Sequence, residues 1–550
     1  MALVETILAM LAACIGLALL ARRLRLPYAV ILVLGGMALA FIPGLPEVRL
    51  DPELALAFFL PPLLQASAFR TDWASFRSSL RPILLLAVGC VVFTAVCVGG
   101  VAKLLLPELP WAAAIALGAI VAPPDAVAAG AVLSRLRLPR RLVTVLEGES
   151  LVNDATALVL YRFAVAAVAA GAVAPWDGLL SFLVLAIGGV AFGWLIGRAA
   201  LWTTVRLEDT LLETALSFLV SYASYLAAEA LHLSGVIAVV TTGLVLGRAQ
   251  HRVFAYDTRL AATAVWRFIE FILNSLVFML IGLQLNQVLG RLDGRVWQDL
   301  LGIALALAAT LIVSRFVWVF PDTWLPRLIP AVRRADPLPG WRIITVISWS
   351  GMRGVVSLAA ALALPLEFPQ RDLIVFLAFV AILATLVLQG TTLEWLICRL
   401  GVAEPPHAHG IDPQEAEGRH AAAQAALAEI ERVLDDPLEG AIAADLVAEF
   451  RDRADHLHRT ATAGGAMAAE RQARRRLRLL ALDAARAQLL EHHRLGRLHP
   501  EGLAKLEQEL DLEEQRVRQV MGGERTTAER QADRARRRGQ TGWGSFLPGG

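Results

Sequence analysis

The chain has 550 residues, of which 57% are hydrophobic, and its mean hydropathy is +0.59. Water-soluble globular chains are about 45–50% apolar, so this composition excludes an ordinary soluble protein and indicates a membrane protein. The net charge of +2 gives no support for nucleic-acid binding, and the four cysteines are too isolated in sequence to predict a disulfide framework or a metal site.

Charged residues divide the chain into two parts. Residues 1–400 carry 53 of them and residues 401–550 carry 47, although the second part is much shorter. We therefore predict a transmembrane domain over 1–400, a helical cytoplasmic tail over 401–521 and a disordered C-terminus over 522–550.

Apolar segments predict about thirteen transmembrane helices and hence an all-α polytopic membrane protein, because a helix needs about 20 mostly apolar residues to cross a bilayer. The segments are 2–21, 27–44, 53–69, 80–106, 111–134, 142–171, 179–203, 209–230, 233–248, 261–288, 299–320, 343–365 and 373–398.

Arginines crowd every second loop between these segments, as in 70–81, 135–141 and 327–342. Positive residues favour the cytoplasmic side of a membrane. The alternation predicts an N-terminus outside the cell and a cytoplasmic C-terminus.

The fifth segment contains "VAPPDAVAAG", residues 121–130. Pro123 and Pro124 remove backbone donors and clash with the preceding turn, so we expect the helix to break there. A broken helix persists in a membrane only where protein or water satisfies the freed backbone groups. Asp125 at this break predicts a functional site.

The sixth segment contains "EGESLVND", residues 147–154. On a helix Glu147, Ser150 and Asp154 share one face, and Glu149 and Asn153 form an adjoining stripe. Asp154 lies about 20 Å into the membrane at 1.5 Å per residue. An ionisable group at that depth is costly and usually marks an ion or proton route. Glu147 is close enough to the cytoplasm to be solvated.

The twelfth segment contains "SWSGMRGVVS", residues 348–357, in which Gly351 and Gly354 lie close to Arg353. Arg353 lies within about a turn of Glu149 in depth. This match predicts a buried ion pair between Glu149 and Arg353.

Two further groups of polar residues within segments predict supporting contacts. Glu270 and Asn274 share a helix face, and Arg267 could pair with Glu270 at i, i+3. We expect Glu270 and Asn274 to have supporting roles. Packing ion pairs are expected for Arg162, Glu213 and Arg315.

The two interrupted segments occupy corresponding positions if segments 1–6 and 8–13 form inverted repeats. Paired broken helices of this kind are the best sequence pointer to a transporter's binding site. The repeat is inferred from hydropathy, since no internal sequence identity is visible. We expect two interrupted helices that cross at the site.

Six motifs together resemble one known family, in its order and over roughly residues 5–400. They are "FLPPLLQASAFR", "PPDAVA", "EGESLVNDATALVL", "SGVIAVVTTGLVLG", "NSLVFMLIGLQL" and "SGMRGVVSLAAAL". The chain is similar to the sodium/proton exchangers of the NHE/NhaP branch of cation/proton antiporters, and most of all to bacterial members.

The resemblance implies that Asp154 exchanges the cation and the proton, with Asn153 as its amide partner. Ser150 and Asp125 would line the same cavity, and the backbone at Pro124 would offer carbonyls. Na⁺ would bind at Asp154, Asp125 and Ser150. Glu149 and Arg353 would be the structural ion pair. A homodimer is also implied.

Two departures from the family pattern bear on ion selectivity. Pro124 stands where many relatives have threonine, and Gln65, Ala66 and Ser67 stand where many have an acid. Asn153 in place of a second acid favours one proton for one cation.

We therefore predict an electroneutral antiporter, and no enzyme, that exchanges cytoplasmic Na⁺ for external H⁺ by alternating access in pH and sodium homeostasis. It would lie in the cell membrane among lipids and need no cofactor beyond the transported ions. K⁺ or Li⁺ as the transported cation is an alternative. A non-transporting membrane sensor and an intramembrane aspartyl protease are rivals, but the protease's Gly-Asp motif is absent from the sequence.

Overall fold

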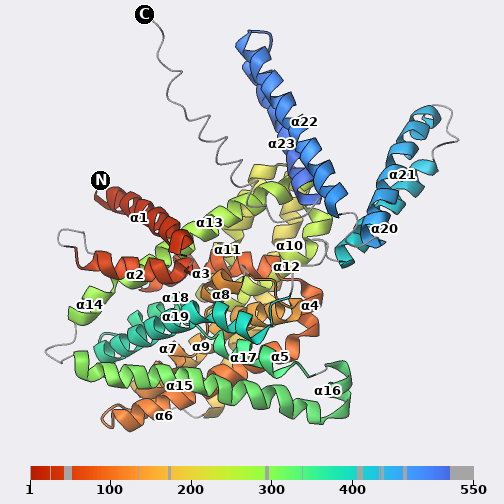
Figure 1. Cartoon of the computed structure of the whole chain (residues 1–550). Coiled ribbons are helices and arrows are strands. Elements are labelled where there is room, and N and C mark those ends of the chain that lie inside the picture. The colour runs from red at the N-terminus through yellow and green to blue at the C-terminus, as the bar shows by residue number, and fades with distance from the viewer. Residues whose placement is uncertain are drawn as a thin grey trace, which may run out of the picture. The chain divides into compact units, whose positions relative to one another are not determined.

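The computed structural model describes residues 2–24, 26–42, 52–133, 136–170, 175–290, 297–336, 338–404, 413–432, 434, 439–462 and 468–520. Every secondary-structure element within these ranges is a helix (Figure 1). Contacts divide the chain into a unit spanning Met1–Glu404, here called the membrane unit, and a second unit spanning Pro405–Gly550, here called the tail. The predicted disordered segment 522–550 lies outside the described residues.

The helices of the membrane unit cover all thirteen predicted segments, singly or as consecutive pieces. In chain order they are α1 (Ala2–Leu24), α2 (Tyr28–Ala40), α3 (Pro52–Arg70), α4 (Trp73–Ser78), α5 (Leu80–Leu84), the π-helix η1 (Leu85–Cys90), α6 (Val91–Leu105), α7 (Trp111–Val121), α8 (Ala126–Leu133), α9 (Arg140–Ala170), α10 (Pro175–Leu207), α11 (Thr210–Ala230), α12 (Gly235–Val253), α13 (Tyr256–Leu283), α14 (Leu285–Gly290), α15 (Trp297–Trp324), the 3₁₀-helix η2 (Leu325–Leu328), α16 (Pro330–Ala335), α17 (Trp341–Trp349), α18 (Val355–Leu362) and α19 (Arg371–Leu400).

Seven stretches in the described part of the chain are long and apolar enough to cross a membrane by themselves, and α2 and α7 are shorter apolar helices. The prediction of an all-α polytopic membrane protein is confirmed. The number of crossings and the inverted repeats stay predictions.

Two helices are interrupted where the sequence predicted it. The break between α7 and α8 contains Pro123 and Pro124, and the break between α17 and α18 contains Gly351 and Gly354. The two breaks meet, because the backbone N–H of Asp125 donates to the carbonyl of Met352 at 2.6 Å.

Glycines allow the closest helix approaches. A Cβ on Gly282 of α13 would lie 2.2 Å from the carbonyl oxygen of Val33 on α2, and one on Gly193 of α10 would lie 2.2 Å from that of Ala238 on α12. Real Cβ atoms do not come so close, so any side chain would push these helices apart. The largest apolar core cluster includes residues of α2, α7, α9, α15 and α19.

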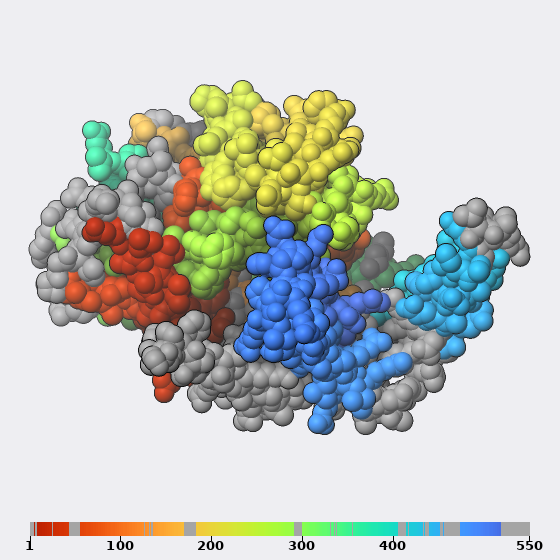
Figure 2. Space-filling model, turned by 90° about the horizontal axis from the view of Figure 1, so that it is seen from above, coloured from red at the N-terminus to blue at the C-terminus, as the bar shows by residue number. Residues whose placement is uncertain are grey.

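The tail consists of two helical hairpins. Helices α20 (Pro413–Glu431) and α21 (Gly440–Thr462) pack on each other, and so do α22 (Ala468–Arg494) and α23 (Pro500–Val520). Figure 2 shows α22 and α23 in blue as one body of side chains. Arg486 of α22 joins the second hairpin through ion pairs to Asp511 and Glu514 of α23.

Candidate functional site

Helix α9 carries the polar stretch predicted to form the site. Glu149, Asn153 and Asp154 are buried, whereas Glu147 is exposed on the protein surface. The exposure of Glu147 agrees with its predicted position near the end of the membrane.

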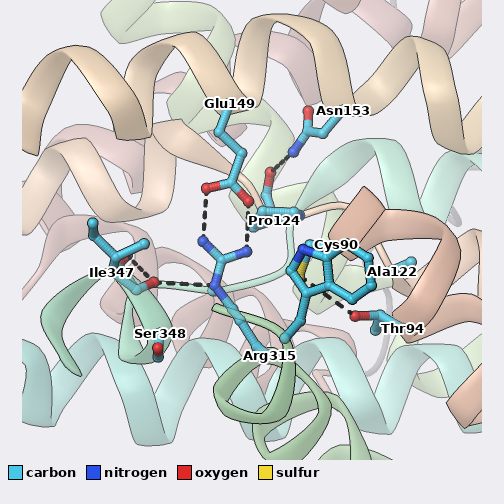
Figure 3. A network of polar contacts seen from close by, with 12 residues as sticks. Cys90, Thr94, Ala122, Pro124, Glu149, Asn153, Arg315, Ile347 and Ser348 are labelled. Carbon is cyan, nitrogen blue, oxygen red and sulfur yellow. Dashed lines mark hydrogen bonds and ion pairs between the residues drawn. The ribbon is translucent and has the colours of Figure 1, made fainter. Parts of the chain in front are cut away.

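Asn153 connects α9 to the break between α7 and α8. Its Nδ2 donates to the carbonyl oxygen of Pro124 at 2.6 Å (Figure 3). This carbonyl lies where the prolines end α7, so it has no regular helical partner. The amide thus satisfies a backbone group that the broken helix exposes, while its own Oδ1 is buried and has no hydrogen-bond partner in the described part of the chain.

Asp125 lies at the start of α8. Its Oδ1 accepts a hydrogen bond from the backbone N–H of Val127 at 2.8 Å, as an N-cap residue does. A Cβ on Gly354 would lie 1.7 Å from the Oδ2 of Asp125. Only glycine at that position allows the second interrupted helix to approach this carboxylate so closely.

One cavity of about 80 Å³ brings four of the five predicted ion-binding residues together, and Asn153 does not line it. Asp125, Ser150 and Asp154 line it, and so does the backbone break at Pro124. This is room for several water molecules, or for an ion that keeps part of its hydration shell. Further polar side chains reach the cavity from Ser67 on α3, Asn274 on α13 and Ser357 on α18.

Neither Asp125 nor Asp154 has a cationic side chain as a partner among the described residues. A buried carboxylate without a partner is costly unless it binds a proton or a cation. The cavity is therefore chemically suited to take up either of them.

The predicted ion pair between Glu149 and Arg353 is wrong. The partner of Glu149 is Arg315 on α15, whose Nη1 and Nη2 donate to the two carboxylate oxygens at 2.6 and 2.7 Å (Figure 3). Both side chains are 2% exposed. The Nε of Arg315 donates to the carbonyl of Ile347 on α17 at 3.1 Å. The packing ion pair expected for Arg315 is thereby confirmed.

Arg353 instead donates hydrogen bonds to backbone carbonyls at the break between α7 and α8. Its Nε donates to the carbonyl of Val121 at 2.9 Å, and its Nη2 to that of Ala122 at 3.4 Å. It also donates to its neighbour Gly351. The carbonyls of Val121 and Ala122 lie at the C-terminal end of α7, where a helix carries unpaired acceptors and partial negative charge. Arg353 therefore caps the broken end of α7.

Two expectations at α13 had different outcomes. Glu270 pairs with Arg70 of α3 at 2.6 Å and not with Arg267, which is exposed. Asn274 lines the cavity, in agreement with a supporting position.

Sequence reasoning missed Ser357 and the environment of Gln65. Ser357 belongs to the quoted segment 348–357, and its position three residues after Gly354 was a usable signal. Gln65 is buried and donates from Nε2 to the carbonyl of Ser217 at 2.5 Å, and within the described ranges its Oε1 has no hydrogen-bond partner. Of Gln65, Ala66 and Ser67, which follow "FLPPLL", only Ser67 lines the cavity.

The crossed interrupted helices and the cavity of carboxylates define an ion-coupled membrane transporter. The profile of the family described as "Sodium/hydrogen exchanger, transmembrane" matches residues 9–399. The chain belongs to this family of cation/proton antiporters.

Known relatives agree with this assignment. The chain is 37% identical to an uncharacterized Na⁺/H⁺ exchanger of Mycobacterium bovis over 82% of its own length and 83% of that protein. It is 34% identical to the Na⁺/H⁺ antiporter ApNhaP of Aphanothece halophytica over 69% and 70% of the two chains. The sodium/proton antiporter MjNhaP1 of Methanocaldococcus jannaschii has the same fold, with a TM-score of 0.57 at 19% identity over 74% of this chain and all of that one.

Proposed function

We propose that this antiporter exchanges cytoplasmic Na⁺ for external H⁺ at the cavity lined by Asp125, Ser150 and Asp154. The observation that carries the proposal is the pair of carboxylates that line one cavity and have no cationic partner among the described residues. Hard monovalent cations prefer oxygen ligands, and these side chains supply them.

Competition for the same oxygens explains why transport would be coupled. A proton on Asp154 removes the charge that attracts the cation, and a bound cation excludes the proton. If the carrier reorients only when it is loaded, competition becomes exchange. We assign the alternation to Asp154 because one oxygen of Asp125 is already engaged in capping α8.

Asn153 supports a stoichiometry of one proton for one cation. Its amide is neutral and holds the broken helix through Pro124. Two adjacent acids would titrate as a coupled pair and could carry two protons. With Asn153 in that place, exchange is electroneutral.

The remaining assignments are proposals on the same basis. We propose a homodimer in the cell membrane, surrounded by lipids, with an external N-terminus, a cytoplasmic tail and a role in pH and sodium homeostasis. The alternation of arginine-rich loops supports the orientation.

K⁺ is the second candidate for the transported cation. A Bacillus subtilis relative, 35% identical over 66% of this chain and 56% of its own length, is a sodium, potassium, lithium and rubidium/H⁺ antiporter. Pro124 also removes the threonine hydroxyl that many relatives place at the site.

The test is ion-driven proton movement in vesicles that contain the purified protein and a pH dye. Additions of Na⁺, K⁺ and Li⁺ to the wild type identify the cation. Asp154→Asn should abolish the signal and still yield folded protein. Asp372→Asn, an acid at the start of α19 outside the cavity, is the matched control and should behave as the wild type. Near-normal exchange by Asp154→Asn would contradict the assignment.

A further inference from the structure

A second cavity of about 80 Å³ lies where several helices carry arginines, and it shares no lining residue with the Asp154 cavity. Its walls come from α5 and η1, the start of α9, the end of α15 with η2, and α17. Most of the wall is apolar, including Leu85, Val145, Val319 and Ile343. Its basic residues are Arg81, Arg141 and Arg327, which we call the arginine cluster.

The arginine cluster already holds one anionic group. All three guanidinium groups donate to the carboxylate of Asp336, which lies between α16 and α17. The Arg327 contact measures 2.7 Å, and the Nε of Arg327 donates to the Asp336 carbonyl at 2.9 Å. Guanidinium groups from three separate elements therefore converge on the oxygens of one acid.

Asp336 neither balances the positive charge of the arginine cluster nor occupies all of its hydrogen-bond donors. Asp322 lines the cavity and Asp336 lies beside it, so three guanidinium groups are accompanied by two carboxylates and one positive charge is in excess. Each guanidinium has five N–H donors. The Nε of Arg81 is buried and has no hydrogen-bond partner among the described residues. Unused donors beside a cavity favour an additional oxyanion.

We propose that this cavity binds the phosphate group of an anionic ligand, held by Arg81, Arg141 and Arg327 beside Asp336. Guanidinium groups match phosphate oxygens in geometry and charge. Basic pockets between transmembrane helices suit lipid head groups, and the apolar wall here suits an acyl chain. The phosphate can come from an anionic phospholipid or from free phosphate, and the experiment separates these sources.

A ligand bound in this cavity would also affect the surroundings of the Glu149–Arg315 ion pair. Ile347 lines the cavity, and its carbonyl accepts the hydrogen bond from Arg315 Nε. A ligand that bridges α5, α9, η2 and α17 therefore stabilises the helices that hold this ion pair. We expect the bound ligand to raise the melting temperature of the protein.

The test measures lipid retention by the full-length protein, purified in neutral detergent, with native mass spectrometry. Phosphatidylglycerol is compared with phosphatidylcholine, and inorganic phosphate is added in a separate arm. The variants are Arg81→Gln, Arg141→Gln and Asp336→Asn. Arg252→Gln is the matched control, because Arg252 is an exposed arginine at the end of α12 and does not line the cavity. Arg141 is 45% exposed, so its replacement should leave the fold intact.

We expect the wild type to retain phosphatidylglycerol in preference to phosphatidylcholine. Arg81→Gln and Arg141→Gln should each weaken retention about five-fold, the loss expected for one arginine near an anionic head group. Asp336→Asn should strengthen it by removing the competing carboxylate, and Arg252→Gln should change nothing.

The phosphate arm identifies the source. Retention that phosphate cannot displace assigns the site to a lipid head group. Displacement by phosphate, together with a rise in melting temperature with phosphate alone, assigns it to free phosphate. Equal retention of both lipids without a phosphate effect would overturn the proposal. So would variants of the cluster that behave like Arg252→Gln.

Discussion

At the scale of single residues, the charged groups inside the membrane unit have three kinds of surroundings. Glu149 and Arg315 neutralise each other in a bidentate ion pair. Arg353 is satisfied by backbone carbonyls at the end of α7. The carboxylates of Asp125 and Asp154 have no cationic partner in the described part of the chain, in agreement with the proposal that they bind the transported ions.

The partner of Glu149 can be tested by a double-mutant cycle. Removing one member of a buried pair leaves an uncompensated charge, so Glu149→Ala or Arg315→Ala should destabilise the protein by about 3–5 kcal/mol. The double variant Glu149→Ala/Arg315→Ala should lose much less than the sum, as measured by thermal unfolding in detergent.

The matched control is the cycle between Glu149 and Arg353, whose losses should be closer to additive because Arg353 pairs with carbonyls. Strong coupling in the Glu149–Arg353 cycle and none in the Glu149–Arg315 cycle would contradict the observed pairing.

At the scale of elements, each interrupted helix supplies what the other needs. Arg353 from the break between α17 and α18 caps the end of α7, and Gly354 makes room for Asp125 at the start of α8. The two breaks therefore form one unit, and Asn153 of α9 holds it through the Pro124 carbonyl.

Asp125 combines a structural task with a charge, and two substitutions separate these roles. Asparagine caps a helix as well as aspartate does, so Asp125→Asn should leave the melting temperature nearly unchanged. Asp125→Ala loses the cap and should cost about 1 kcal/mol of stability. Both variants remove a cavity carboxylate, so both should impair cation-driven proton movement in vesicles. Unimpaired transport by Asp125→Asn would show that only the cap matters.

Asp336 gives the arginine cluster a dependence on pH. Burial raises the pKa of its carboxyl, but the hydrogen bonds and charges of Arg141 and Arg327 lower it by more, so the pKa lies below the ordinary value of 3.8. A pKa that is lower in the folded state adds stability above the unfolded-state value, and this stability is lost as the pH falls through the folded-state value.

The difference in melting temperature between the wild type and Asp336→Asn should therefore be constant near neutral pH and shrink below about pH 4. The measurement is a series of thermal unfolding curves of both proteins across this range. A difference that stays the same in acid would show that the ionised carboxylate does not stabilise the fold.

At the scale of the whole molecule, the number of titrating groups at the site sets the response to voltage. If one positive charge moves in each direction, the membrane potential does no net work on the exchange cycle. We predict that the Na⁺ gradient that balances a given pH gradient does not move when a K⁺/valinomycin potential is imposed on vesicles. A balance point that follows the voltage would rule out one-for-one exchange and make Asp125 the second proton carrier.

The sequence by itself determined the all-helical membrane architecture, both helix breaks and the family. Those features are local, since apolar length, the Pro123–Pro124 pair and the motif around Asp154 each act within one segment. Helical periodicity also correctly placed Ser150 and Asp154 on one face, which the cavity now shows.

Only the tertiary structure decided which buried charges meet. Matching by depth paired Glu149 with Arg353 and gave Arg315 no named partner, because depth along a helix says nothing about the direction in which a side chain points. The crossing of the two breaks turns Arg353 toward the end of α7 and lets Arg315 reach Glu149 past Gly351, where a Cβ would lie 2.7 Å from the Cδ of Arg315. The arginine cluster around Asp336 likewise arises from helix ends far apart in the sequence, and packing alone brings them together.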